Sequence, residues 1–315
     1  MPTVKSTKCC AAKLVKSNMD IPPYQRSGFR RAEPYLYLFP VLVGVVLVTG
    51  GAIVASFLLG FTDWDLVRPP VWVGLANFRA MIGSEQFYQV LGNTFYFVAI
   101  TAPLMVACSL GLALLVNRKL RGATFFRTIY FFPVVTSMIA VAVVWGWLYN
   151  PEFGLINYVL KEWFGVQGPG WLLSTSWALP AIALMTVWKG VGYNMLIFLA
   201  GLQSIPDHLH ESALIDGAGG MRRLFSITLP MLSPTTFFVV VITLIGSFQL
   251  FEQTYTLTQG GPANSTLTLS YYIYQNAFQY FRMGYATAMA YVLFAVTLVV
   301  TIIQFRMQRR WVYYG

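Results

Sequence analysis

Leu36-Tyr-Leu-Phe-Pro-Val-Leu-Val-Gly-Val-Val-Leu-Val-Thr-Gly-Gly-Ala-Ile-Val-Ala-Ser-Phe-Leu-Leu59 is an uninterrupted apolar stretch without a charged side chain. A helix needs about 20 predominantly apolar residues to cross the hydrocarbon core of a bilayer. The stretch is too long for the apolar region of a cleaved signal peptide, so we expect it to stay in place as a membrane span.

Five further stretches have the length and apolar character of the first. The predicted spans are residues 36–59, 90–116, 125–149, 177–201, 235–257 and 285–305. We expect Pro103 to break the second span, and Pro133 lies near the start of the third. Only helices and closed barrels satisfy their backbone in lipid, and stretches of this length are helices. The sequence therefore predicts an all-α integral membrane protein with six transmembrane helices.

The composition agrees with a bilayer as the natural solvent. Of 315 residues, 57% are hydrophobic and 10% are charged, whereas a soluble domain carries roughly 25% charged residues. The three cysteines, Cys9, Cys10 and Cys108, form neither a disulfide framework nor a metal-ligand pattern.

Basic residues in the loops assign the orientation, because cytoplasmic loops carry an excess of Lys and Arg. With the N-terminus inside, the outer loops hold four of the 21 Lys and Arg residues, namely Arg68, Arg79, Lys161 and Arg282. Lys189 lies within a predicted span. The remaining basic residues fall in inner segments and are Lys5, Lys8, Lys13, Lys16, Arg26, Arg30, Arg31, Arg118, Lys119, Arg121, Arg127, Arg222, Arg223, Arg306, Arg309 and Arg310. The asymmetry predicts that both termini are cytoplasmic. The net charge of +10 then reflects topology and contact with anionic membrane lipids, and requires no nucleic-acid partner.

The predicted inner loop between the fourth and fifth spans is patterned. It reads Gln203-Ser-Ile-Pro-Asp-His-Leu-His-Glu-Ser-Ala-Leu-Ile-Asp-Gly-Ala-Gly-Gly-Met-Arg-Arg-Leu-Phe-Ser-Ile-Thr-Leu-Pro230. The pattern predicts two short helices joined by a turn, with Ser204 as the N-cap of the first helix and Gly217 at its end. The small residues Ser212 and Ala213 would let the surface of another protein approach closely. The alternative is an amphipathic loop that lies on the membrane.

The same loop resembles a motif of known transport proteins. Permease subunits of ABC importers share a cytoplasmic Glu-Ala-Ala, three residues, Gly, nine residues and Ile-x-Leu-Pro. This chain has Glu211-Ser212-Ala213, Gly217 and Ile227-Thr-Leu229-Pro230 with every spacing matching, and Ser212 is the single departure. The resemblance implies a coupling helix that docks in a groove of an ATP-hydrolysing subunit and transmits its closure to the spans. The residues to which it assigns this role are Glu211, Ser212, Ala213, Asp216, Gly217, Ile227, Leu229 and Pro230.

Other segments resemble the sugar branch of that family over about residues 34 to 315. They are Pro34–Pro40, Phe61–Trp64, Phe125–Pro133, Thr258–Pro262 and Arg309–Tyr314. This branch includes the larger membrane subunit of maltose-type importers and the first permease of glycerol-phosphate importers. The resemblance implies a transmembrane domain at 34–315 and leaves residues 1–33 as a cytoplasmic tail. The partners that it implies are a second permease subunit in a heterodimer, two ATP-binding cassette subunits and an extracytoplasmic substrate-binding protein.

Polar residues inside two predicted spans are candidates for a substrate pathway. An ionisable side chain within a bilayer normally faces a bundle interior or a watery cavity, and Lys189 and Glu252 are such side chains. Nearby residues can hydrogen-bond hydroxyl groups (Tyr193, Asn194, Gln249 and Gln253) or pack against a sugar ring (Trp188, Phe248 and Phe251). By resemblance to maltose-type importers, Gly190, Tyr193, Ser247 and Gln249 would hold the sugar.

Structural explanations for the same residues are open. Lys189 and Glu252 would neutralise each other if their depths in the membrane agree. Asn194 and Gln249 would serve as hydrogen-bonding contacts between helices. Gly190 and Gly192 would permit close packing of helices.

Other function classes have weaker support. The chain lacks the Gly-x-x-x-x-Gly-Lys-Ser/Thr pattern of a nucleotide-binding P-loop. His208 and His210 are two positions apart and do not share a helix face, so a metal site is not expected. An ion-coupled secondary transporter would show inverted repeats, and none is evident. A membrane enzyme such as a glycosyltransferase would need an acidic cluster in a loop, for which Asp63 and Asp65 are the nearest candidates.

The sequence thus predicts a transport subunit rather than an enzyme, placed in the bacterial cytoplasmic membrane. We expect it to move a sugar or polyol by alternating access, with a glycerol-phosphate-type solute as the second choice. No cofactor is expected in this chain, because ATP and Mg²⁺ would be bound by the partner ATPase subunits.

Overall fold

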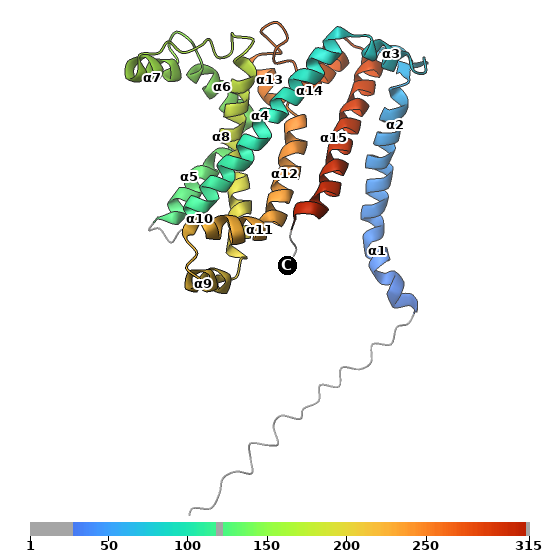
Figure 1. Ribbon diagram of the computed structural model, residues 1–315. Helices are drawn as coiled ribbons and strands as arrows, with labels where there is room; N and C mark the ends of the chain where they lie inside the picture. The colour runs from blue at the N-terminus through green and yellow to red at the C-terminus, as the bar shows by residue number, and fades with distance from the viewer. Residues whose placement is uncertain (1–27, 118–121, 313–315) are drawn as a thin grey trace, which may run out of the picture. The chain divides into compact units, whose positions relative to one another are not determined.

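The computed structural model describes residues 28–117 and 122–312 (Figure 1). Most of the predicted N-terminal tail, with Cys9 and Cys10, and the basic loop residues 118–121 lie outside the described residues. The chain divides into two compact units, Met1–Ala55 and Ser56–Gly315.

The described part of the first unit is helical. It contains α1 (Gly28–Gly44), the π-helical turn η1 (Val45–Gly50) and the start of α2 (Gly51–Leu59), which continues into the second unit. Residues Tyr37–Leu59 are long and apolar enough to cross a membrane, as predicted. No side chain of η1 or α2 is buried, and an apolar helix with most of its surface exposed suits a lipid environment.

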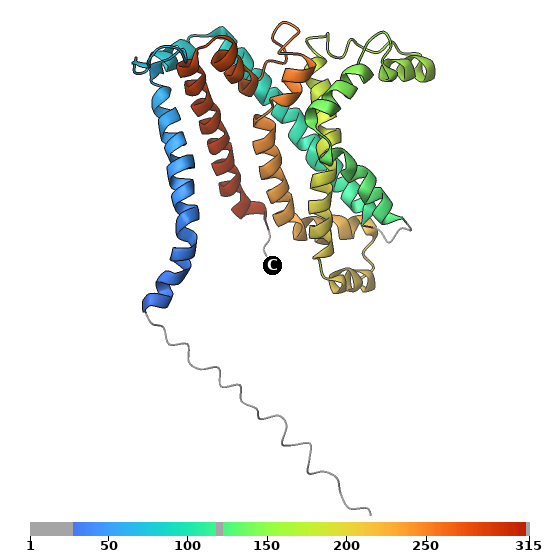
Figure 2. The same ribbon diagram turned by 180° about the vertical axis from the view of Figure 1, so that it is seen from behind.

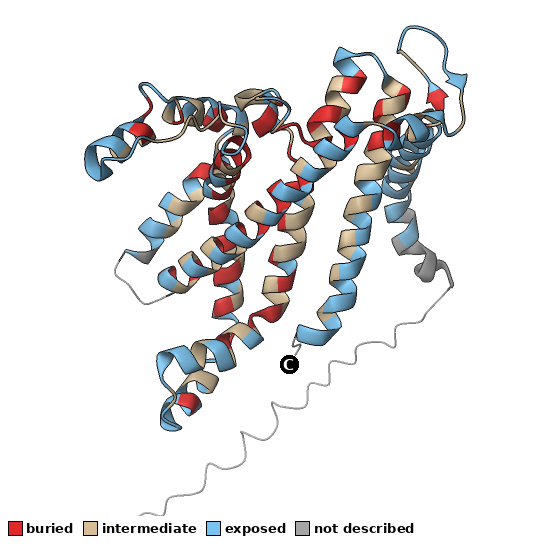
Figure 3. Ribbon diagram, turned by 45° about the horizontal axis from the view of Figure 1, so that its top comes forward, coloured by how far each residue is buried: buried red, intermediate tan, exposed pale blue. Residues whose placement is uncertain are grey.

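Four long helices form the frame of the second unit. They are α4 (Glu85–Val116), α8 (Ala178–Gln203), α12 (Ser233–Phe248) and α15 (Met283–Trp311). The α4 helix packs most extensively against α8, and α12 contacts α4, α8 and α15. Buried positions gather where these helices meet, while their outward faces are exposed (Figure 3).

The α4 helix is continuous through Pro103, so the predicted break at this residue is wrong. It begins at Ser84, whose side chain caps the helix by accepting a hydrogen bond from the backbone N–H of Phe87 at 3.4 Å. Thr101 and Ala102, next to the proline, are buried in the bundle. Packing by neighbouring helices lets a membrane helix tolerate a proline.

The predicted third and fifth spans are interrupted. In place of 125–149, the structure has α5 (Ala123–Val135) and α6 (Met138–Leu148), bent by 100°. In place of 235–257, α12 ends at Phe248 and α13 (Glu252–Leu257) follows after a non-helical step. Among the described residues, four helices have the length and apolar character of a span. The number rises to six if two bent pairs each count as one span, namely α5 with α6, and residues Gly220–Met231 with α12, which are bent by 65°.

Short elements join the long ones. A two-residue antiparallel ladder pairs β1 (Thr62–Asp63) with β2 (Val71–Trp72), so the fold is mostly rather than entirely helical. The helix α3 (Ala76–Ile82) follows this ladder, and α7 (Leu155–Phe164) lies between α6 and α8. After α13 come α14 (Leu269–Tyr274) and the π-helical turn η3 (Gln275–Gln279).

The patterned loop forms α9 (Asp207–Ile215), α10 (Gly220–Arg223), the π-helical turn η2 (Leu224–Thr228) and α11 (Leu229–Met231). Both views place these elements at one end of the second unit and α7, α13 and α14 at the other (Figures 1 and 2). The two predicted helices and the turn between them are present. The predicted N-cap is wrong, because Ser204 is the C-cap of α8 and donates its hydroxyl to the Gly201 carbonyl at 2.7 Å.

Candidate functional site

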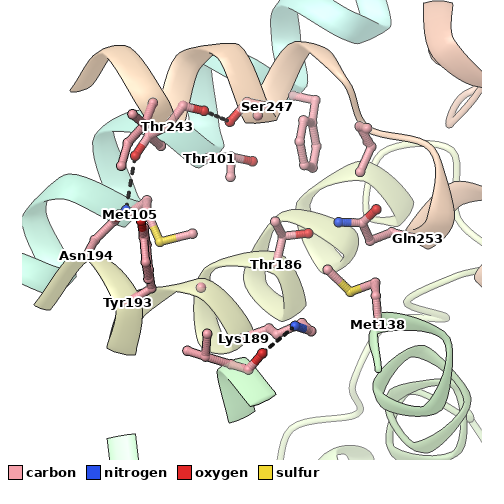
Figure 4. Close-up of a pocket in the computed structure, with 16 residues that line it drawn as sticks. Thr101, Met105, Met138, Thr186, Lys189, Tyr193, Asn194, Thr243, Ser247 and Gln253 are labelled. Carbon is pink, nitrogen blue, oxygen red and sulfur yellow. Dashed lines mark hydrogen bonds between the residues drawn. The ribbon is translucent and has the colours of Figure 1, made fainter. Parts of the chain in front are cut away.

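A cavity of about 370 Å³ lies among the helices of the second unit (Figure 4). Its walls come from α4, the α5/α6 bend, α8, α12 and α13. The lining residues are Phe97, Thr101, Met105, Val134, Met138, Thr186, Lys189, Gly190, Tyr193, Asn194, Ile242, Thr243, Gly246, Ser247, Leu250 and Gln253. The cavity is thus an apolar chamber with a limited set of polar groups, which is the composition of small-molecule sites in general.

The bend between α5 and α6 shapes one wall. The Thr136 backbone N–H and hydroxyl both donate to the Pro133 carbonyl, at 3.3 Å and 2.6 Å. The Lys189 ammonium donates to the Val134 carbonyl at 3.4 Å. These bonds occupy carbonyl groups that α5 leaves open where it ends, so an irregular backbone is tolerated inside the protein.

The break after α12 shapes the opposite wall. The Thr268 hydroxyl donates to the Leu250 carbonyl at 2.9 Å, and the Ser270 hydroxyl donates to the Phe248 carbonyl at 3.2 Å. Side chains from the segment that leads into α14 therefore hold this break in place. Because the helix stops at Phe248, Leu250 and Gln253 reach the cavity from the non-helical step and from α13.

Polar groups of the lining differ in whether they have partners. Asn194 donates to the Thr243 hydroxyl at 3.0 Å and so joins α8 to α12. The Ser247 hydroxyl donates to the Thr243 carbonyl of its own helix at 2.8 Å. In contrast, the Thr101 hydroxyl is fully buried and has no hydrogen-bond partner among the described residues. The Asn194 contact supports the structural explanation of that residue as a link between helices.

The two predicted glycines of α8 have different surroundings. A side chain at Gly192 would point into the backbone of α5 at Tyr130 and Phe131. A side chain at Gly190 would meet the end of the Met105 side chain, 2.6 Å from its Cε atom. Gly192 is therefore a close-packing position, and Gly190 is part of the cavity lining.

Five of the nine residues predicted for the substrate pathway line this cavity. They are Lys189, Gly190, Tyr193, Asn194 and Ser247. The other four, Trp188, Phe248, Gln249 and Glu252, do not. Trp188 packs against Trp145 beside a separate apolar pocket, and Phe248 is buried against Phe95. Gln249 is the C-cap of α12, and Glu252 opens α13 with its side chain exposed.

Lys189 and Glu252 do not pair. Within the described ranges, the ion pair that is formed joins Arg68 to Asp65 in the loop after β1. The proposed mutual neutralisation therefore fails, because the break after α12 carries Glu252 onto the separate helix α13. Lys189 instead bonds the end of α5.

Several residues that line the cavity are not predicted from the sequence. Thr186 lies three and four residues before Lys189 and Gly190, so helical spacing on α8 could have found it. Thr243 precedes Ser247 by one helical turn and could have been found in the same way. Thr101 and Met105 come from α4, and only the packing of α4 on α8 brings them to the cavity.

The coupling-helix candidate α9 has a defined C-terminal turn. The Ala218 N–H donates to the Ala213 carbonyl at 2.8 Å and the Gly217 N–H to the Leu214 carbonyl at 3.0 Å. This is the Schellman pattern, in which the residue at the position of Gly217 takes a left-handed conformation. Gly217 has a φ of +72°, with open space where a side chain would start. Glycine is therefore favoured at position 217 because of its backbone conformation and not because of crowding by neighbouring atoms.

The surface of α9 is divided between an anchored face and a free face. Leu209 packs against the cluster that contains Leu202 and Leu232 at the end of the bundle. Ala213 is predicted to let another protein approach, but it is buried, because it lies one helical turn after Leu209 on the same face of α9. The predicted coupling residues Glu211, Ser212 and Asp216 are exposed, as is Pro230, while Ile227 and Leu229 are half-buried. Large apolar side chains also lie exposed around this end, namely Leu214, Ile215, Met221 and Phe225.

Within the described residues, no group of three or more His, Cys, Asp or Glu side chains has a metal-binding arrangement. His208 and His210, which lie on α9, belong to no such group.

The known proteins that resemble this chain are membrane components of transport systems. The family model "Binding-protein-dependent transport system inner membrane component" matches residues 104–313. A probable ABC transporter permease protein of Bacillus subtilis (strain 168), YesP, is 38% identical over 285 residues, covering 89% of this chain and 91% of that protein. The sn-glycerol-3-phosphate transport system permease protein UgpA of Rhizobium meliloti (strain 1021) is 37% identical over 247 residues, covering 78% and 83%.

A solved structure has the same fold. It is a chain of a bacterial ABC transporter involved in the import of the acidic polysaccharide alginate, and it aligns with a TM-score of 0.79 and 26% identity over 90% of this chain and 97% of that chain. The extent of the family match and the identity to its relatives agree with the motif of the α9 loop. The chain therefore belongs to the binding-protein-dependent transport system inner membrane components, the permease subunits of ABC transporters.

Proposed function

We propose that this permease carries a sugar, a polyol or a related hydroxylated solute into a bacterium through the cavity between α4, α8 and α12. The observation that carries the proposal is the cavity itself, which combines hydroxyl, amide and ammonium groups with the rings of Phe97 and Tyr193. Hydroxyl-rich solutes need such hydrogen-bonding groups, and sugar rings pack on aromatic faces. The import of alginate by the transporter with the matching fold supports this solute class.

The mechanism that we propose is alternating access driven by partner ATPases. The α9 helix is anchored through Leu209, which packs against the cluster that contains Leu202 of α8 and Leu232 at the start of α12. A push on its exposed face would therefore move two walls of the cavity as a rigid body. Helix shifts of this kind convert a local contact into a change of global state. ATP and Mg²⁺ would be bound by the partner chains.

The proposed setting is the bacterial cytoplasmic membrane, with six crossings and both termini inside. In this topology α9 faces the cytoplasm, where ATPases reside, and α7, α13 and α14 face outward. A second permease subunit would complete the translocation path as a heterodimer with this chain. An extracytoplasmic binding protein would deliver the solute to the outer end.

A glycerol-phosphate-type solute is the second candidate within the same importer class. The specific observation in its favour is Lys189, whose ammonium group lines the cavity. The relative UgpA is named as part of an sn-glycerol-3-phosphate transport system.

The functional test is the ATPase activity of the assembled importer. This chain, its partner permease and candidate ATPases are reconstituted in lipid, and binding protein is added either empty or loaded with members of a solute panel. We expect one loaded binding protein to raise the rate of ATP hydrolysis above that with the empty protein. If the chain forms no stable complex with any ATPase, the proposal is wrong and an ion-coupled transporter becomes the better explanation.

A docking variant tests the role of α9. We expect Ile215→Asp to abolish copurification of the ATPase subunits, because Ile215 is 87% exposed on this helix and a carboxylate would be buried at the proposed contact. Val67→Asp is the matched control, since Val67 is 86% exposed and lies between β1 and β2 at the other end of the unit. Equal ATPase recovery from both variants would contradict the assignment of α9.

A further inference from the structure

We infer that Lys189 makes the cavity selective for an anionic solute, either a carboxylate-bearing saccharide or a phosphate ester of a polyol. The inference rests on the proposed function, since it assumes that the solute passes through this cavity. It goes further in disfavouring the neutral members of the proposed solute class and in extending the role of Lys189 to any hydroxylated solute that carries an oxyanion.

Lys189 is the single charged side chain of the lining. The 16 residues drawn around the cavity include no Asp, Glu or Arg (Figure 4). A charge at membrane depth is costly unless an opposite charge or water compensates it. Because the expected partner Glu252 lies outside the cavity, no carboxylate of the lining supplies that compensation. The cavity in its present form is therefore electropositive.

The contact between Lys189 and the end of α5 compensates part of the positive charge of the ammonium group. A cation beside the last carbonyl groups of a helix is favourable because of the helix dipole, and the Lys189 ammonium donates to the Val134 carbonyl at the end of α5. That bond is long, at 3.4 Å, and an ammonium group has three N–H donors. Two N–H donors of the ammonium group therefore remain for a solute, and no carboxylate of the lining neutralises its charge. The half-buried side chain is open to the cavity and not enclosed in the core.

A second feature that points to a ligand lies on the cavity wall formed by α4. The Thr101 hydroxyl of α4 is fully buried, lines the cavity and has no partner among the described residues. Buried polar groups are almost always hydrogen-bonded, so this group is suited to a solute or to bound water. Gln253, which is nearly buried, adds an amide from α13. One fixed charge with neutral hydrogen-bonding groups around it fits a hydroxylated body that carries a single oxyanion.

Solutes of other charge fit less well. A cation would meet the Lys189 ammonium without a carboxylate in the lining to balance it. The hydroxyl groups of a neutral sugar can accept hydrogen bonds from the ammonium but bring no opposite charge, so they compensate a buried cation less than an oxyanion does. An oxyanion forms charge-assisted hydrogen bonds with the same group.

The test is uptake into proteoliposomes that contain the complete importer, with its binding protein outside. Two pairs of radiolabelled solutes are compared, each differing in charge but little in size. The first pair is a uronic acid disaccharide and its methyl ester, and the second is sn-glycerol 3-phosphate and glycerol. We expect wild-type importer to accumulate the anionic member of one pair and not its neutral counterpart. Which pair is used distinguishes a carboxylate from a phosphate.

Variants at Lys189 assign this preference to the permease, because the binding protein stays the same. We expect Lys189→Met to lower the maximal uptake of the anion by about tenfold to a hundredfold per assembled importer, the effect of losing a hydrogen bond between charged groups. Lys189→Arg keeps the charge and is expected to retain uptake within a few fold. A purely structural role at the end of α5 would instead lower the yield of assembled importer in Lys189→Met.

The results that would contradict the inference differ from those that would contradict the proposed function. Wild-type uptake of a neutral member alone, or unchanged anion uptake by Lys189→Met, overturns the inference and leaves the proposed function standing. Loss of assembly in Lys189→Met, whether or not Lys189→Arg restores it, shows a structural role and also overturns the inference. Absence of uptake for every solute, together with no ATPase in the complex, overturns the proposed function itself.

Discussion

Gly192→Leu is expected to destabilise the helix bundle severely and to prevent recovery of a correctly folded importer. The first side-chain atom at this position would collide with the backbone of α5 at Tyr130 and Phe131. Backbone atoms cannot step aside as a flexible side chain can, so α5 would have to move away from α8. Overpacking typically costs about 1–3 kcal/mol and sometimes more. We expect the upper end of that range or beyond, measured by thermal unfolding of the detergent-purified complex.

Gly190→Leu is the matched control on the same helix. The side chain there would meet the flexible end of Met105 on the cavity side, so we expect a smaller loss of stability. Displacement of α5 by Gly192→Leu would also shift Val134 and Met138, which form part of the cavity wall. Equal melting temperatures for Gly192→Leu and wild type would contradict the close approach of α5 and α8.

The positions of the long helices could be predicted from apolar length alone. Residues 177–201 and 285–305 were predicted, and the helices α8 and α15 extend only a few residues beyond them. The irregularities could not be predicted in this way. Pro103 was expected to break a helix that continues, because neighbouring helices support it. The break after α12 is held by hydroxyl groups of Thr268 and Ser270, which donate to backbone carbonyl groups at that break. These residues lie about twenty positions further along the chain, so the sequence around Phe248 gives no sign of the contacts.

The candidate site was predictable to the extent that it lies on one helix face. Lys189, Gly190, Tyr193 and Asn194 share the cavity because they lie on one face of the regular helix α8. Ser247 joins them from the last turn of α12. Extending the helical period across residues 249–252 misplaced Gln249 and Glu252, since the backbone leaves the helix at that point. The contribution of α4, including Thr101, depends on tertiary packing and had no local signal.

The patterned loop was the most predictable part of the chain. Glycine at position 217 gives the left-handed turn that ends α9. Which face of α9 is anchored could not be predicted, because Leu209 meets residues of other helices there while Leu214 is exposed. The error at Ser204 has a simple cause, because the same residue type caps either end of a helix. Its hydroxyl bonds back to α8 rather than forward to α9.

Gly246→Trp is the sharpest test of whether the solute passes through the cavity between α4, α8 and α12. Gly246 lines the cavity, is exposed and has no atom within 4 Å of the position where a side chain would begin. An indole ring is therefore expected to fill the path without straining the fold. Gly111→Trp is the control, because Gly111 is also exposed with open space around it but lies on α4 outside the lining.

The measurement is ATP-driven uptake of the cognate solute by proteoliposomes that hold equal amounts of assembled importer. We expect Gly246→Trp to reduce uptake to the level seen without ATP, while Gly111→Trp transports as wild type does. Uptake by Gly246→Trp at the wild-type rate would show that the solute takes a route other than this cavity.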